Sequence, residues 1–211
     1  VQRDGFWWSQ SYQLGVPDAP VAKGKATDGH GTIVRFYPSD EIFETTEFSF
    51  EVLSTRFREM AFLNKGLTIS LKDMRAGHVD DKGEQLQVVY KFDGGIVDFV
   101  RHINSTRGEL HKSIIDLEQE DKKRKMSLEI AMQWNAGFSE SVFTFANAIN
   151  THEGGTHEEG FRTALTSVVN KFGEDWGFIR KKEDRLTGED IREGLTAIVS
   201  IKISEPQFEG Q

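Results

Sequence analysis

The sequence contains no cysteine, only 4 prolines among 211 residues, and no long apolar run. The lack of cysteine excludes disulfides, thiolate nucleophiles and cysteine-based zinc sites. No stretch approaches the roughly 18 consecutive apolar residues that a membrane-spanning helix needs, and no charged and then apolar leader opens the sequence. We therefore expect a cytoplasmic protein without thiol chemistry and without a membrane partner.

The chain also lacks an excess of positive charge. Its 26 Lys and Arg residues are outnumbered by 34 Asp and Glu, which gives a formal net charge of −8. No overall positive field draws such a chain toward nucleic acid, so any contact with nucleic acid must be local. With 37% apolar and 11% aromatic residues, the composition is that of a globular protein, and the length suits one or two domains.

The first third of the chain predicts a strand, a helix and a second strand. Residues 32–37 are β-branched or aromatic and predict a buried strand. From residue 46 the apolar side chains recur every three to five positions, which predicts an amphipathic helix that ends near Gly66. Residues 67–71 then alternate as in a strand. The polar residues 73–84 predict a boundary between two substructures.

The residues after this boundary follow strand and helix patterns in turn. Strand patterns occupy residues 86–92, 128–134, 142–149 and 195–203, and helical patterns occupy residues 94–105 and 160–172. We expect the second and third of these strands to pair as a hairpin across the turn at residues 136–137. The last strand has apolar residues on one face, so we expect it to be half-buried.

A stretch rich in histidine and glutamate precedes the second helix. A helical zinc site needs two histidines four residues apart, whereas His152 and His157 are five apart with two glycines between them. The pattern therefore predicts no metal site. It predicts a glycine loop followed by a helix, with Thr156 as the N-cap and with Glu158 and Glu159 near the positive end of the helix dipole.

Two basic features have a functional and a structural interpretation. The run at residues 122–125 follows several acidic residues, and it predicts a solvated loop between strands rather than a nucleic-acid patch. Arg162 directly follows the apolar Phe161, so a fixed scaffold could present its guanidinium to phosphate. From spacing alone, a local ion pair on the helix surface is the favoured interpretation of Arg162.

Five segments carry distinctive motifs over most of the chain. They are GTIVRFY at 31–37, MAFLNKG at 60–66, AMQWNAG at 131–137, THEGGTHEEGFR at 151–162 and GEDIREGLTAIVSIKISEPQFEGQ at 188–211. Together they resemble the ATPase region of the bacterial DNA gyrase B subunit, the ATPase subunit of a type IIA topoisomerase. The fourth segment and the ending EPQFEGQ are similar to actinobacterial members. The topoisomerase IV B subunit is the alternative that the motifs leave open.

The resemblance implies an α+β fold in two parts. Residues 1–75 resemble the C-terminal remnant of a GHKL ATP-binding sandwich. Residues 76–211 resemble a transducer domain with a mixed β-sheet and a left-handed β-α-β crossover, a rare exception to the right-handed rule. The chain starts at Val1 rather than Met and stops at Gln211, and neither end resembles a designed or processed terminus. We therefore expect a partial chain.

The resemblance also implies roles for individual residues. Thr32 and Val34 match a strand beneath the adenine of ATP, and Gln211 matches a transducer glutamine that reaches the γ-phosphate. Arg162 matches an arginine that lines the cavity through which captured DNA passes. The family's catalytic glutamate and Mg²⁺-binding asparagine belong to segments upstream of Val1. We therefore expect neither catalytic nor metal-binding residues in this chain, and neither hydrolysis nor tight binding of ATP.

For the full-length enzyme the resemblance implies ATP and Mg²⁺ as cofactors. It implies DNA as a partner, the gyrase A subunit in a heterotetramer, and a self-dimer of the ATPase region when ATP is bound. Such an enzyme couples ATP hydrolysis to DNA strand passage and negative supercoiling. The rival hypothesis is a non-enzymatic, transducer-like binding module. One argument against this hypothesis is that residues 32–37, without a neighbouring strand, would expose an unpaired and aggregation-prone strand edge.

Overall fold

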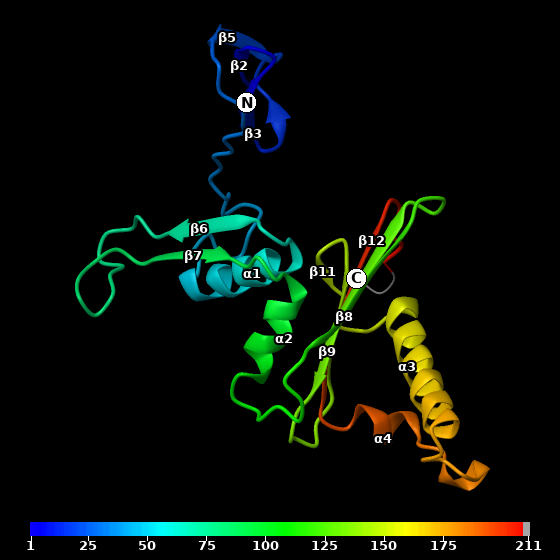
Figure 1. Ribbon diagram of the computed structural model, residues 1–211. Coiled ribbons are helices and arrows are strands. Elements are labelled where there is room, and N and C mark those ends of the chain that lie inside the picture. Colours follow the sequence, from blue (N-terminus) through cyan, green and yellow to red (C-terminus); the bar gives the residue numbers. More distant parts are fainter. Residues whose placement is uncertain (209–211) are drawn as a thin grey trace. The chain divides into compact units, whose positions relative to one another are not determined.

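The structure, a computed structural model, describes residues 1–208 and forms two compact units (Figure 1). The first unit comprises Val1–Ser49 and the second begins at Phe50. Within residues 1–208, no helix has the length and apolar character needed to cross a membrane.

The first unit contains five short strands that the sequence patterns did not predict. β1, β2 and β5 form an antiparallel sheet in the order β1-β2-β5, and β3 pairs with β4. The bounds are Gln2–Arg3 for β1, Phe6–Ser9 for β2, Tyr12–Gln13 for β3, Val16–Pro17 for β4 and Ala22–Ala26 for β5. Strands of two to five residues are too short to establish a hydrophobic period, and every residue of β5 is exposed.

The buried strand expected at residues 32–37 is absent. These residues have no regular structure, and Ile33 and Val34 are 71% and 78% exposed. Phe36 meets Phe48 edge-on, with ring centroids 5.9 Å apart. Strand propensity records only that a side chain suits a pleated, half-buried surface, and a strand also needs a neighbour to satisfy its backbone. No described strand pairs with residues 32–37, so the prediction of a buried strand is wrong for this structure.

The second unit opens with a helix and a hairpin. Helix α1 spans Phe50–Leu63, so it begins four residues later than expected, and Gly66 after it has a φ of +81°. β6 (Thr68–Lys72) pairs with β7 (Gln87–Lys91) in an antiparallel hairpin. Both predicted strands are therefore confirmed.

The polar residues 73–84 lie in the connection between these two paired strands. Asp73 is buried there and accepts hydrogen bonds from the backbone and side chain of Arg75. These bonds, the Arg75 side chain first, hold the pKa of the Asp73 carboxyl well below its usual range. The compact units divide between Ser49 and Phe50 instead. The domain division at residues 75 and 76 that the resemblance implies stays a prediction.

The main sheet has five strands in the order β11-β10-β12-β9-β8. β10 and β12 run parallel, while the remaining neighbours are antiparallel. The bounds are Ile115–Asp121 for β8, Met126–Trp134 for β9, Ser141–Ala146 for β10, Ile149–Asn150 for β11 and Leu195–Ile203 for β12. The expected mixed sheet and α+β class are confirmed, and the basic residues 122–125 form the predicted loop between β8 and β9.

The position of β12 corrects two expectations. β9 and β10 do not form the expected hairpin, because β12 lies between them and pairs with both. β12 is not half-buried either, because residues 195–200 are buried on both faces of the sheet. Alternation along one strand does not reveal whether a second layer covers its polar face. Here Thr196 is fully buried and donates to Oδ1 of Asn104, 2.6 Å away.

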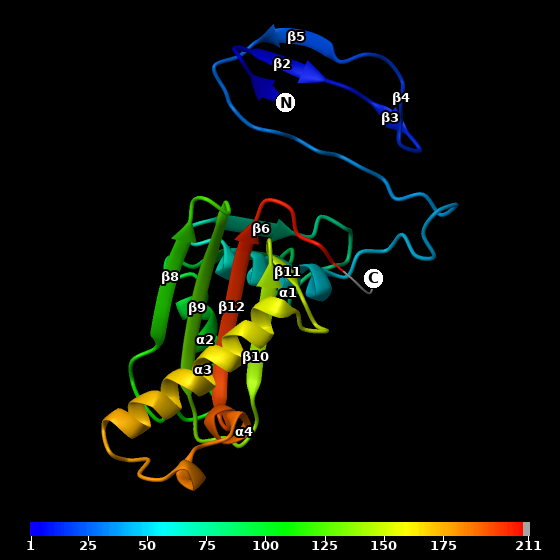
Figure 2. The same cartoon turned by 90° about the vertical axis from the view of Figure 1, so that its right-hand side faces the viewer.

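Helices cover both faces of this sheet (Figure 2). α1 and α2 lie on one face, and α3 and α4 lie on the other, with a short 3₁₀ helix, η1, before α4. The bounds are Ile96–Asn104 for α2, Thr156–Asp175 for α3, Lys182–Asp184 for η1 and Gly188–Arg192 for α4. The predicted helices at 94–105 and 160–172 are confirmed, the second in a longer form.

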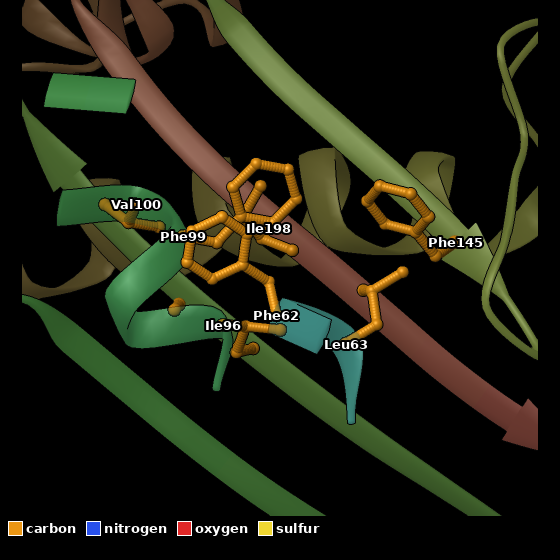
Figure 3. Close-up of a cluster of buried hydrophobic side chains, with 8 residues drawn as sticks. Phe62, Leu63, Ile96, Phe99, Val100, Phe145 and Ile198 are labelled. Atoms are coloured by element: carbon orange, nitrogen blue, oxygen red, sulfur yellow. The ribbon is translucent and has the colours of Figure 1, made fainter. Parts of the chain in front are cut away.

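Two hydrophobic cores result, one on each face of the sheet. Figure 3 shows the first, in which Phe62 of α1 stacks on Phe99 of α2 with centroids 4.6 Å apart, above Ile198 of β12. The second joins α3 and α4 to the sheet. Its buried members are Ile130, Phe161, Leu165, Ile191, Leu195, Ala197 and Val199. Burial of this kind stabilises the fold by about 25 cal/mol per Å² of apolar surface.

The connection from β10 through α3 to the parallel strand β12 has the hand that the resemblance implies. In Figure 2 both strands run upward, α3 crosses in front of the sheet, and the chain passes from β10 on the right to β12 on the left. In this view a right-handed crossover would place the second parallel strand to the right of the first. The crossover is therefore left-handed.

We predict that Ile198→Ala destabilises the second unit by about 2–5 kcal/mol, because it leaves a cavity in the centre of the first core. Ile149→Ala is the matched control, since Ile149 lies in the edge strand β11 and is 42% exposed. We expect the control to cost less than about 1 kcal/mol. Urea unfolding followed by circular dichroism measures both values, and equal losses in the two variants would contradict the central role of β12.

Candidate functional site

The candidate site lies around the start of α3, next to the glycine loop. Gly155 is the N-cap of α3, and its carbonyl accepts the backbone N–H groups of Glu158 and Glu159 at 3.0 and 3.1 Å. The prediction that Thr156 caps the helix is wrong, because Thr156 is already the first helical residue and no side chain caps this end. The expected glycine loop and the two first-turn glutamates are confirmed.

Arg162 belongs to a four-residue cluster of alternating charge. Its Nε donates to Oε1 of Glu158 at 2.9 Å, and its Nη2 lies 2.8 Å from the same oxygen. Nη2 also lies 2.7 Å from Oε1 of Glu140, and Oε2 of Glu140 accepts from Nε of Arg192 at 3.0 Å. Three parts of the chain meet here: α3, α4 and the residue just before β10.

The cluster is partly shielded from solvent. The side chains of Arg192 and Glu158 are 13% and 18% exposed, and those of Glu140 and Arg162 are 27% and 32% exposed. Burial lowers the pKa of Arg162, but the hydrogen bonds and charges of Glu158 and Glu140 outweigh burial and raise it. Arg162 therefore stays charged, in the local ion pair that its spacing favoured. Its role in a DNA cavity stays a prediction.

A chain of hydroxyl groups leads from this cluster to the glycine loop. Oε2 of Glu158 accepts from Oγ1 of Thr144 at 3.2 Å, and Oγ1 of Thr144 lies 2.7 Å from Oγ1 of Thr151. Oγ1 of Thr151 lies 3.1 Å from Nε2 of His157. Burial lowers the pKa of His157, and the charge of Glu158 opposes this only in part. His157 is therefore predominantly neutral at pH 7.

A cleft of about 780 Å³ adjoins the glycine loop. Residues 150–157 line one part of it, and Ile201, Ile203 and residues 205–208 line another. Among residues 1–208, its lining includes the carboxylates of Glu153 and Glu205 but no lysine or arginine.

Two of the three residues expected to contact ATP are among the described residues. Thr32 and Val34 lie in the first unit, where both are exposed. Gln211 lies outside the described residues. Within residues 1–208, no group of three histidine or carboxylate side chains could hold a metal ion. The roles of Thr32, Val34 and Gln211 toward ATP stay predictions.

Sequence analysis identified neither of the two ion-pair partners of Arg162. Glu158 precedes Arg162 by four residues on one helix, a spacing that favours ion pairs, so this partner could have been found. Glu140 and Arg192 are 52 residues apart, and no local pattern connects them. Thr144 and Thr151 become neighbours across the turn after β10, where β11 pairs with β10 and Thr151 donates its backbone N–H to the carbonyl of Thr144.

Comparison with known proteins identifies relatives over the whole chain. The family model described as DNA gyrase B matches residues 95–211. The DNA gyrase B subunit of Streptomyces coelicolor is 57% identical over 100% of this chain and 32% of its own length. The corresponding protein of Mycobacterium tuberculosis is 48% identical over 100% of this chain and 34% of its own length. The chain thus spans about a third of the length of the curated relatives that it matches.

Solved structures agree with this result. The B subunit of the gyrase of Myxococcus xanthus has a TM-score of 0.78 at 24% identity, over 99% of this chain and 57% of that one, and this likeness shows the fold alone. The 43K ATPase domain of Thermus thermophilus gyrase B has a TM-score of 0.76 at 25% identity, over 99% and 55%. The topoisomerase IV ATP-binding domain of Francisella tularensis has a TM-score of 0.73 at 18% identity, over 99% and 54%, and shows the fold alone. The family model covers more than half of the chain, and this chain therefore belongs to the DNA gyrase B family.

Proposed function

We propose that this chain is part of the ATPase region of a gyrase B protein that couples ATP binding and hydrolysis to DNA strand passage and negative supercoiling. The observation that carries the proposal is the family match over residues 95–211, which includes β12, α3 and the charge cluster. The left-handed crossover supports it, because that connection is rare in unrelated folds. The acidic net charge of −8 restricts any DNA contact to local basic groups such as Arg162.

We propose that residues 1–75 belong to the ATP-binding domain and residues 76–211 to the transducer. In the full-length enzyme, Thr32 and Val34 would lie beneath the adenine, and Gln211 would contact the γ-phosphate. Mg²⁺ would neutralise phosphate charge during hydrolysis. The exposed apolar side chains at positions 33 and 34 support the assignment of the first part, because a covering layer from the rest of an ATP-binding domain would bury them.

The proposed mechanism is a closing clamp. ATP binding would dimerise the ATPase region around DNA, and the transducer would pass the presence of the γ-phosphate to the DNA-cleaving parts and to the gyrase A subunit in a heterotetramer. Such coupling requires contacts that differ between two states. Gln211 would supply a contact that exists before hydrolysis and is lost after it. An enzyme that acts on the bacterial chromosome would be cytoplasmic.

A topoisomerase IV B subunit is the second candidate. The two enzymes share the fold, so the structural likeness does not separate them. Identities of 48–57% over the whole chain to gyrase B proteins favour gyrase. Supercoiling of relaxed plasmid by the full-length protein together with gyrase A tests the choice, because decatenation without supercoiling would favour topoisomerase IV.

We predict that this chain alone does not hydrolyse ATP, because the resemblance places the family's catalytic glutamate and Mg²⁺-binding asparagine in segments upstream of Val1, and hydrolysis needs a group that orients water and a metal ion that neutralises the phosphates. Phosphate release is measured for the purified chain, and the full-length protein is the positive control. Activity that co-elutes with the chain through two further purification steps would contradict the prediction.

We predict that Gln211→Ala in the full-length protein lowers supercoiling per ATP hydrolysed by about tenfold. The free energy of unfolding should stay within about 0.5 kcal/mol of the wild-type value. Gln119→Ala is the control, because Gln119 is exposed on the edge strand β8. Supercoiling and ATP turnover are measured in the same reaction. An unchanged ratio between them would refute the role of Gln211.

A further inference from the structure

The guanidinium of Arg162 is held by two carboxylates, while one of its edges has no described partner. Glu158 and Glu140 bind Nε and Nη2, and Nη1 forms no hydrogen bond or ion pair within residues 1–208. The cluster contains two arginines and two glutamates, so its formal charge is zero. A charge on the surface that is already neutralised contributes little to binding a phosphate, because binding then releases few counterions.

We propose that Glu158 and Glu140 form a carboxylate clamp that withholds Arg162 from DNA phosphates until one carboxylate releases it. This inference rests on the proposed DNA role of Arg162 and assigns its regulation. In the structure both carboxylates contact the guanidinium of Arg162, so this carboxylate clamp is closed. A phosphate that approaches Nη1 meets two carboxylates around the same guanidinium, and their repulsion offsets the attraction of the single cation.

Glu158 is the carboxylate that connects the clamp to the cleft. Glu140 is fixed between two cations, Arg162 and Arg192, at 2.7 and 3.0 Å. Glu158 has one cationic partner, and its second oxygen accepts from Thr144 at 3.2 Å. That hydroxyl continues through Thr151 to the loop that lines the cleft. A movement of this loop therefore changes the hydrogen bonds of Glu158 without disturbing the pair of Glu140 with Arg192.

The clamp also explains why Arg162 has a fixed orientation. The contacts of Nε and Nη2 with one oxygen of Glu158, and of Nη2 with one oxygen of Glu140, restrict the guanidinium plane, and the side chain is two-thirds buried at 32% exposure. The free edge at Nη1 is thus presented in one direction. Release of Glu158 would leave the pair with Glu140 to orient the same plane, while the net charge of the cluster rises from zero to +1.

The test measures duplex DNA binding by the full-length protein with fluorescence anisotropy at several salt concentrations. Glu158→Gln removes one negative charge from the clamp and keeps the shape of the side chain. Glu159→Gln is the matched control, because it makes the same change in net charge on the same helical turn, and Glu159 is exposed and unpaired within residues 1–208. The double variant Glu158→Gln with Arg162→Gln asks whether any gain depends on Arg162.

We expect Glu158→Gln to bind DNA about fivefold more tightly at roughly 50 mM salt, with a slope of log K against log salt that steepens by about 1. Glu140→Gln should act in the same direction, and Glu159→Gln should change affinity less than twofold. The gain should vanish in the double variant. An equal gain in Glu159→Gln would overturn the clamp, because overall charge would then explain the effect.

The remaining outcomes separate the clamp from the proposed DNA role. If Glu158→Gln binds no more tightly than wild type while Arg162→Gln reduces the salt slope, the clamp is wrong and the DNA contact stands. If the double variant keeps the full gain, Arg162 is not the group that contacts DNA, and its proposed role fails. If neither Glu158→Gln nor Arg162→Gln changes the DNA affinity or its salt slope, the proposed DNA role of Arg162 fails as well.

Discussion

The second unit depends on one strand that is buried on both faces. β12 pairs with β10 on one side and β9 on the other, and residues 195–200 are buried. Leu195, Ala197 and Val199 pack under α3 and α4, while Ile198 packs under α1 and α2. A single strand thus holds both cores together. The buried hydroxyl of Thr196 is accommodated because Asn104 accepts its hydrogen bond, which avoids the cost of an unsatisfied polar group.

The same strand creates the setting of the charge cluster. Because β10 and β12 are parallel, the chain must cross the sheet between them, and α3 and α4 provide this crossover. The crossover places Arg162 of α3 and Arg192 of α4 on either side of Glu140, just before β10. It also places the glycine loop against the residues that follow β12. The proposed DNA contact and the cleft are therefore linked through one supersecondary unit.

The first unit shows that local strand propensity alone does not determine which residues form a strand. Residues 32–37 have the composition of a strand, yet they are exposed and unpaired among the described residues. Neighbouring elements bury a strand and satisfy its backbone hydrogen bonds, and the composition of the strand does not reveal whether those neighbours are present. The five-stranded sheet behaves differently, because its strands find their neighbours within residues 115–203.

The sequence by itself determined the α+β class, the helices α1, α2 and α3, most strands of the second unit and the family. These features depend on periodicity and on segments of consecutive residues, which are local properties. Only the tertiary structure decided that β12 separates β9 from β10 and that Glu140 and Arg192 join Arg162. Strand order and ion pairs between distant residues depend on which surfaces the cores bring together, and the pattern of a single segment does not contain that information.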